Sequence, residues 1–357
     1  MTDAPFEPPK LELPETDTLT GFHIETLKYG EDQHITPAGL YVAEGNTDPL
    51  ALTNFKLVEG TTRSLVGVTD ANRLLQVITH IAAGIEVNFG YFPLIAVGVK
   101  HGNPCGVAVG RDAVDVVTRM VAGDKRAIFG GVIMTNFAIT PKVAEALMAR
   151  EEGDPRRLFD GIYAPSVDDG VIETLERRNG KCRIMTNPAL EDLDVTSLDT
   201  APRRIPVRGG WLLQPNYTFV LEYNKSVRYG PAIGYKQRRD LIVAWAIGST
   251  SNSNTITIVR DGQLLGNGVG QQDRVGAAEL AVKRALDAGH DLNSAVAYSD
   301  SFFPQPDGVE VLANAGIKAI FTSSGSQNDN ATIETCKRLG VTLLMQPDEN
   351  VRGFAWH

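Results

Sequence analysis

The sequence predicts an α/β fold, because apolar runs alternate with amphipathic stretches through most of the chain. The run at 92–99 is apolar and short, which is typical of an inner strand in a covered sheet. This order of segments favours layers of helices and strands. Strands are expected at 92–99, 128–134, 183–186, 254–259, 294–299, 317–322 and 341–345.

Three stretches carry the signals of a helix. Thr140 supplies an N-cap and Pro141 stands at the first helical position, with apolar residues following on one face. A second apolar stripe runs over 275–289 and ends on a glycine. A third helix is expected over 329–340, again closed by a glycine.

Length and composition fit a globular protein of two domains. The 357 residues can bury a large core, and 43% of them are hydrophobic and 22% charged. The net charge is −9 without a Lys/Arg-rich stripe, which argues against nucleic acid as a partner. No segment approaches a membrane span, so we expect no membrane partner.

The cysteines and the N-terminus indicate the compartment. Cys105, Cys182 and Cys336 are odd in number and lack CxxC spacing, which is typical of a reducing environment. The N-terminus is acidic and proline-rich, without the basic start or apolar stretch of a signal peptide. We therefore expect a cytoplasmic protein.

A polar stretch with Pro and Gly near 187–230 is expected to separate two halves. Residues 1–20 then form a flexible or loosely docked arm, residues 21–200 a first domain, and residues 201–357 a connecting segment with a second domain. A reactive-looking turn follows a strand in each half, Lys100-His101 in the first and 300–304 in the second. That parallel points to a duplicated fold.

Lys100 and His101 are the first candidate site. They follow the apolar strand directly, ahead of an expected turn at Asn103–Gly106, and ligands of open α/β sheets bind beyond the carboxyl ends of strands. The pair offers a fixed positive charge beside a group that exchanges a proton near neutral pH. From these residues alone, a solvated strand cap is an equally good interpretation.

Two other patterns fall short of known motifs. The run 266–270, GNGVG, precedes a helix, but Gln271 stands where a dinucleotide fingerprint needs glycine, so a tight turn feeding a helix is expected. The run from Pro104 resembles a zinc-deaminase signature, but Ala108 replaces its second cysteine. The six histidines show no ligand spacing, and we expect no zinc.

Taken together, the motifs resemble a known family. In order along the chain they are Leu27-Lys28-Tyr29-Gly30, Lys100-His101-Gly102-Asn103-Pro104-Cys105-Gly106, Phe129-Gly130-Gly131, Asp160–Pro165, Ser253-Asn254, Gly268–Arg274, Ser299–Pro304 and Gly325-Ser326. From about Leu27 to the C-terminus the chain resembles the AICAR transformylase part of the bifunctional purine-biosynthesis protein, without the cyclohydrolase domain.

The resemblance implies a function and a fold. The reaction would transfer the formyl group of 10-formyltetrahydrofolate to the 5-amino group of AICAR. The fold would be two duplicated, cytidine-deaminase-like, three-layer α/β subdomains, in a homodimer with shared active sites. Whether a monovalent cation is bound stays open.

The resemblance also implies a role for each site residue. Lys100, His101 and Asn254 would be catalytic. Nucleotide binding would fall to Lys28, Tyr29, Gly130, Asp160 and Arg352. Folate binding would fall to Asp307, Asp273, Arg274 and Val275.

Departures from the family lie mainly on the nucleotide side. Lys28 stands where the family usually has Arg, and Gly67 where it usually has Asn. Lysine lacks the bidentate fork that suits phosphate. Two alternatives therefore stay open, a diverged formyltransferase for a related amino-imidazole nucleotide and a non-catalytic nucleotide-binding subunit.

Overall fold

A computed structural model describes residues 10–149 and 157–353, so residues 1–9 of the expected N-terminal arm lie outside the described part. The helices are α1 Leu65–Phe89, α2 Ala113–Ala122, α3 Pro141–Met148, α4 Ile172–Leu175, α5 Tyr235–Ser249, α6 Arg274–Asp287, α7 Asp307–Asn314, α8 Asp329–Leu339 and α9 Asp348–Val351.

The strands form one large mixed sheet and two small hairpins. They are β1 Gly21–Leu27, β2 Ala38–Ala43, β3 Lys56–Glu59, β4 Leu94–Lys100, β5 Asn103–Gly110, β6 Gly131–Thr135, β7 Phe159–Ala164, β8 Arg183–Thr186, β9 Arg203–Val207, β10 Gly210–Gln214, β11 Val227–Tyr229, β12 Ile256–Arg260, β13 Gln263–Gly268, β14 Val296–Ser299, β15 Ala319–Ser324 and β16 Thr342–Pro347. The α/β prediction is confirmed, and the seven predicted strands correspond to β4, β6, β8, β12, β14, β15 and β16.

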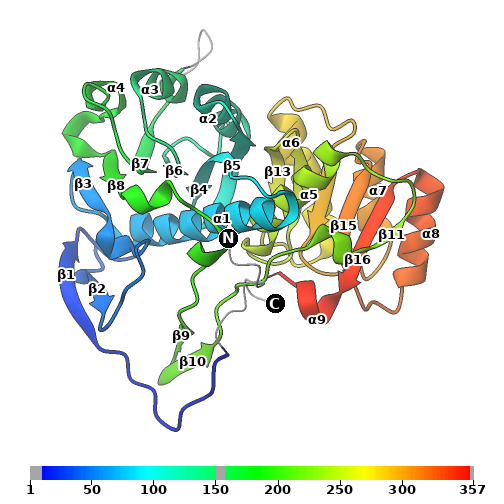
Figure 1. Ribbon diagram of the computed structural model, residues 1–357, viewed down its shortest axis with the longest axis horizontal. Helices are drawn as coiled ribbons and strands as arrows, with labels where there is room; N and C mark the ends of the chain where they lie inside the picture. Colours follow the sequence, from blue (N-terminus) through cyan, green and yellow to red (C-terminus); the bar gives the residue numbers. More distant parts are fainter. Residues whose placement is uncertain (1–9, 150–156, 354–357) are drawn as a thin grey trace.

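The two halves of the large sheet repeat one topology. Its twelve strands run in the order β11-β16-β15-β14-β12-β13-β5-β4-β6-β7-β8-β3. In each half an antiparallel hairpin, β4–β5 or β12–β13, is followed by three strands that pair in parallel with one another. An antiparallel edge strand, β3 or β11, closes each outer edge, and β5 meets β13 in the middle (Figure 1).

The helices cover the sheet in two layers. The long helix before each hairpin, α1 or α5, lies on one face, and both share a single core with the strands beneath them. On the other face α2, α3 and α4 cover the first half and α6, α7 and α8 the second, each with its own core. Along β4, Val97 and Val99 face the first layer while Ala96 faces the second, as the period of a strand requires.

The turn that corresponds to Lys100-His101 is Arg260-Asp261, and the expected match with residues 300–304 is wrong. Both pairs end the first strand of a hairpin, whereas 300–304 follows β14, the counterpart of β6. The prediction chose the wrong turn of the second half, because β13 and β14 separate Arg260-Asp261 from residues 300–304 along the chain.

The expected tight turn at 266–270 is also wrong over its first three residues, which lie in β13. A Cβ on Gly266 would stand 2.1 Å from the carbonyl oxygen of Ala281 in α6. A Cβ on Gly106 in β5 would stand 2.4 Å from the carbonyl oxygen of Met120 in α2. These glycines therefore let a helix pack directly on a strand.

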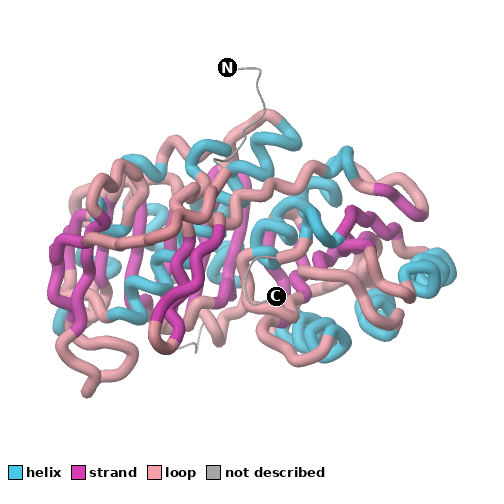
Figure 2. The backbone as a smooth tube through the Cα atoms, turned by 90° about the horizontal axis from the view of Figure 1, so that it is seen from below, coloured by secondary structure: helices cyan, strands magenta, loops and turns pink. Residues whose placement is uncertain are grey.

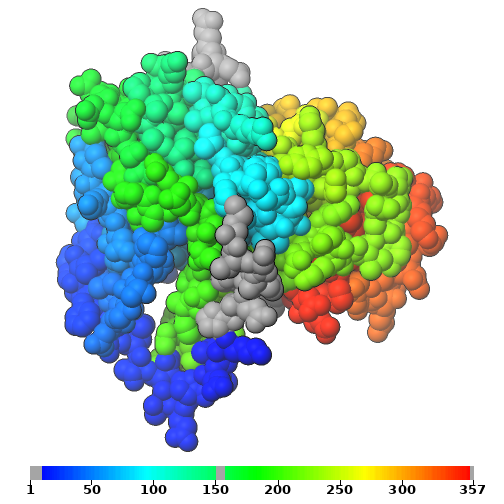
Figure 3. All heavy atoms as spheres, in the orientation of Figure 1, coloured from blue at the N-terminus to red at the C-terminus, as the bar shows by residue number. Residues whose placement is uncertain are grey.

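The β9–β10 hairpin projects from the body of the molecule, downward in Figure 1 and toward the viewer in Figure 2. Asp17 of the N-terminal segment accepts hydrogen bonds from Arg204 Nε at 2.8 Å and from Trp211 Nε1 at 2.8 Å. Figure 3 shows the dark-blue N-terminal segment against the green hairpin. Asp17 thus attaches the segment of residues 10–20 to the β9–β10 hairpin.

Candidate functional site

The β4–β5 hairpin presents Lys100 and His101 at its tip. β4 ends at Lys100, and the turn of His101 and Gly102 leads directly into β5. Both turn residues have positive φ, 52° and 72°, as a type I′ hairpin turn requires. The expected turn over Asn103–Gly106 is wrong, because these residues are already strand and pair with β4.

The hairpin tip borders a cleft of about 400 Å³. α1 contributes Asp70, and β7 contributes Asp160 and the buried Tyr163. Five of the predicted site residues line this cleft together: Tyr29, Lys100, His101, Gly130 and Asp160. Three of the five nucleotide-side predictions therefore meet the Lys-His pair in one place.

Charges of both signs line the cleft. Lys100 Nζ donates to the carbonyl oxygen of Phe129 at 2.6 Å, which fixes its ammonium group beside Gly130. Asp160 is paired with Arg177, and Arg183 donates to the carbonyl oxygen of Lys181 at 3.0 Å. Such a lining suits a polar molecule that offers both donors and acceptors.

Two buried groups at the cleft have shifted proton affinity. Burial raises the pKa of the Asp70 carboxyl, although the hydrogen bond from Gly102 N opposes the shift. Burial also raises the pKa of Tyr163, whose hydroxyl lies beside Arg63. Low solvent access strengthens electrostatic interactions at this end of the cleft.

Lys28 lies next to the cleft but does not line it. Its ammonium nitrogen lies 5.7 Å from the centroid of the Tyr29 ring, a cation–π arrangement. Tyr29 itself lines the cleft. Lys28 thus contacts a residue of the cleft rather than its interior.

Six predicted residues lie in the second half of the fold, away from this cleft. Asn254 Nδ2 donates to the carbonyl oxygen of Gln271 at 2.8 Å. Asp273 caps α6 by accepting a bond from Gly276 N at 2.6 Å, and Val275 follows in the first turn. Asp307 begins α7.

The other two, Arg274 and Arg352, belong to one ionic cluster. The Arg274 guanidinium is buried and paired with Asp300, and burial lowers its pKa to about 10. Arg352 Nε donates to Asp348 Oδ2 at 2.7 Å. Gly353 N donates to the carbonyl oxygen of Asp300 at 2.7 Å, which links the two pairs.

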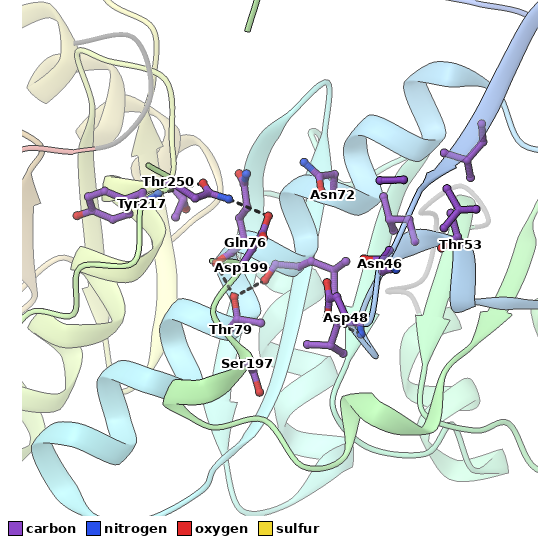
Figure 4. Close-up of a pocket in the computed structure, with 18 of the residues that line it drawn as sticks. Asn46, Asp48, Thr53, Asn72, Gln76, Thr79, Ser197, Asp199, Tyr217 and Thr250 are labelled. Atoms are coloured by element: carbon purple, nitrogen blue, oxygen red, sulfur yellow. Dashed lines mark hydrogen bonds between the residues drawn. The ribbon is translucent and has the colours of Figure 1, made fainter. Parts of the chain in front are cut away.

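A second cavity, of about 230 Å³, lies along α1. Figure 4 shows Gln76 and Thr79 of α1 between Asp48 on one side and Tyr217 on the other. His80 also lines it, and burial lowers the pKa of this imidazole to about 4. No predicted site residue is among the described residues that line this cavity.

The described residues contain neither a cluster of metal ligands nor a membrane-spanning helix. Over 10–149 and 157–353, no group of three or more His, Cys, Asp or Glu side chains is arranged to hold a metal ion. Within the same ranges, no helix combines the length and hydropathy needed to cross a bilayer.

Sequence reasoning missed Asp70 and Arg183, which line the cleft. Asp70 was visible only as part of the Thr69-Asp70-Ala71 run, and Arg183 only as the first residue of a predicted strand. An aspartate at the sixth position of the helix before each hairpin, Asp70 in α1 and Asp240 in α5, is the signal that could have been read.

An imidazole and an ammonium group at the rim of a polar cleft are typical of enzymes that act on small polar substrates. The comparisons with known proteins give the family. The chain belongs to the AICARFT/IMPCHase bienzyme family, whose model matches residues 5–284.

Relatives with curated names agree with this family. The bifunctional purine biosynthesis protein PurH of Oceanobacillus iheyensis is 31% identical over 335 residues, which is 93% of this chain and 60% of that protein. PurH of Listeria monocytogenes serotype 4b is 30% identical over 339 residues, with the same coverage. The chain thus spans about 60% of the length of these relatives.

One solved structure shows a slight likeness. A diaminohydroxyphosphoribosylaminopyrimidine deaminase/5-amino-6-(5-phosphoribosylamino)uracil reductase from Thermotoga maritima aligns with 27% of this chain and 30% of its own, at 20% identity and a TM-score of 0.21. This likeness is too small to bear on the fold.

Proposed function

We propose that the protein transfers the formyl group of 10-formyltetrahydrofolate to the 5-amino group of AICAR, giving FAICAR and tetrahydrofolate in purine biosynthesis. The observation that carries the proposal is the meeting of Lys100 and His101 with Tyr29, Gly130 and Asp160 in one cleft. Family membership supports the same reaction.

The chemistry requires one proton to move from the attacking amine to N10 of the folate. The amine of AICAR adds to the formyl carbon and loses a proton, which the His101 imidazole accepts. The C–N10 bond of the folate then breaks, and the imidazolium returns the proton to N10. Lys100, whose ammonium is fixed at the cleft, stabilises the oxyanion that forms between the two steps.

The residues of the second half enter this proposal through a second copy of the chain. The described cleft of one protomer is not lined by any of the six predicted residues of the second half, which are Asn254, Asp273, Arg274, Val275, Asp307 and Arg352. A homodimer in which they approach the partner's cleft would bring the folate to the nucleotide. A cytoplasmic location is part of the same proposal.

The repeated topology supports a duplication, with residues 21–200 and 201–357 as the units. That both units are cytidine-deaminase-like and without zinc is part of the same proposal. A helix, a hairpin and three parallel strands recur in each.

The test is a direct assay with AICAR and 10-formyltetrahydrofolate, following tetrahydrofolate and identifying the nucleotide by mass. FAICAR formed at catalytic rates supports the proposal. Tight AICAR binding without turnover would instead identify a non-catalytic nucleotide-binding subunit.

A second candidate is a formyltransferase for a related amino-imidazole nucleotide. It is favoured by Lys28, which stacks on Tyr29 outside the cleft instead of offering a bidentate phosphate contact. A panel of amino-imidazole nucleotides in the same assay separates the two, because the true acceptor has the highest kcat/KM.

A further inference from the structure

A carboxylate from α1 holds the turn that carries His101. Asp70 is only 5% exposed, and its Oδ1 accepts a hydrogen bond from Gly102 N at 2.6 Å. Both turn residues adopt the left-handed conformation, which is costly for a side chain such as that of His101. The bond to Asp70 stabilises a turn that is strained by itself.

In the second half of the molecule, an aspartate of the long helix likewise accepts hydrogen bonds from a hairpin turn. Asp240 is the sixth residue of α5, as Asp70 is of α1. Asp240 accepts hydrogen bonds from Asp261 N at 2.7 Å and Gly262 N at 2.8 Å, in a turn with φ of 51° and 73°. An aspartate that braces the hairpin turn is therefore a common structural part of both halves.

The two aspartates differ in what surrounds the brace. Asp240 is ion-paired with Arg239 at 2.9 Å, and the turn residue Asp261 is exposed. Asp70 lines the cleft together with His101. In the first half, the brace thus places a carboxyl group in the same cleft as an imidazole.

We propose that Asp70 is a positioning residue for His101, which fixes the turn so that the imidazole faces the cleft and stabilises the imidazolium while it holds the proton. The proposal rests on the proposed function and names a residue that acts through His101 rather than on the substrate. Other titratable groups line the pockets that border this turn. They are Tyr29, Glu31, Asp32, Arg63, Lys100, Asp160, Tyr163 and Arg183 in the cleft, Cys105, Asp124 and Arg284 in a pocket beside Lys100 and His101, and Arg73, Asp199, Arg203 and Arg204 in a pocket beside Gly102.

The test is a proton NMR titration of His101 in the full chain. The chain has six histidines, so the resonance is assigned by its loss in His101→Gln. Asp70→Asn keeps an acceptor for Gly102 N but removes the charge, which disfavours the imidazolium. We expect the His101 titration midpoint to fall by about half a pH unit or more, as loss of a neighbouring opposite charge requires.

Asp240→Asn is the matched control, since it alters the corresponding brace far from His101. We expect it to leave the His101 midpoint unchanged. In the activity assay, Asp70→Asn should lower kcat about tenfold with little change in the KM for the nucleotide, and move the acidic limb of the rate profile to lower pH. Asp70→Glu, which restores the charge, should return the midpoint toward that of the native chain.

An unchanged midpoint in Asp70→Asn, or an equal shift in Asp240→Asn, overturns the proposal and leaves Asp70 as a structural brace. If Asp70→Asn does not fold, Asp70→Ser is titrated in its place with the same expectation. The titration needs no turnover, so its result is independent of the proposed reaction. A shifted midpoint in a chain that transfers no formyl group supports the positioning role while rejecting the proposed substrate.

Discussion

The β4–β5 and β12–β13 hairpins share one frame, and only one of them ends at a cleft with an imidazole. Each has a two-residue turn with positive φ, an aspartate brace and a glycine four residues beyond the turn glycine. The strand-end cation differs in its partners: Lys100 is fixed at the cleft, whereas Arg260 bonds Asp291 at 3.0 Å. The difference teaches that two hairpins with the same backbone can present different side chains, and that the first of them places an imidazole at the cleft.

The largest contrast is expected when each turn loses its side chain. His101→Ala should lower turnover about 10³-fold, the usual contribution of a general acid–base group. Asp261→Ala, at the corresponding turn, should leave turnover within about twofold, because Asp261 is exposed and remote from the cleft. Steady-state kinetics with AICAR and 10-formyltetrahydrofolate check both, and equal losses would contradict the assignment of chemistry to the first hairpin.

The strand glycines test the shared frame. Gly266→Ala should lower the free energy of unfolding by about 3 kcal/mol, because its Cβ would stand 2.1 Å from a backbone oxygen of α6. Gly106→Ala should cost less, since the corresponding separation is 2.4 Å. Urea unfolding measures both; a Gly266→Ala loss under about 1 kcal/mol would show that α6 moves away freely.

The long helices differ in their response to acid. His80 in α1 has its pKa lowered to about 4 by burial, whereas the corresponding residue after α5 is Thr250. Burial of the neutral His80 imidazole contributes to the free energy of unfolding above pH 6.5. This contribution is lost as the pH falls toward 4, because over that range the unfolded chain binds the proton and the folded chain does not. Between pH 7 and pH 5 the loss is about 2 kcal/mol.

His80→Gln should remove this part of the pH dependence. Urea unfolding at pH 7 and pH 5 gives the difference. His34→Gln, at an exposed histidine, is the control and should leave the pH dependence as it is in the native chain. The same slope in His80→Gln as in the native chain would assign the acid sensitivity to other groups.

The smallest contrast concerns the turn glycines. Gly102→Ala should cost about 1 kcal/mol, because φ is 72° but nothing lies within 4 Å of the added Cβ. Gly262→Ala should cost more, since its Cβ would stand 2.7 Å from Val109 Cγ2. Thermal unfolding of the two variants checks the order, and the reverse order would mean that the hairpins are not held alike.

Local signals in the sequence predicted much of this fold. The helix that begins after Thr140 and the helix that ends at Gly340 are present as α3 and α8, because caps depend on a few neighbouring residues. β4 could be predicted because its residues are continuously apolar and buried.

The strands β5 and β13 could not be predicted in this way. Their glycines and Asn103 read as turn residues, while their real role, close contact with α2 and α6, is set by segments distant in sequence. In the candidate site, Lys100 and His101 stood out through their place after a strand. Asp70 did not, because its brace to Gly102 spans 32 residues of chain.

The attachment of the N-terminal segment to the β9–β10 hairpin has a spectroscopic consequence. Trp211 is 48% exposed, and its indole N–H is bound to Asp17, whereas Trp245 is fully buried beside α1. Indole emission shifts to longer wavelength in polar surroundings and is quenched by iodide only where the ring is accessible. The sequence contains a third tryptophan, Trp356. In a Trp356→Phe variant the other two therefore give separable fluorescence signals, and detachment of the segment can be followed without a label through the quenching of Trp211.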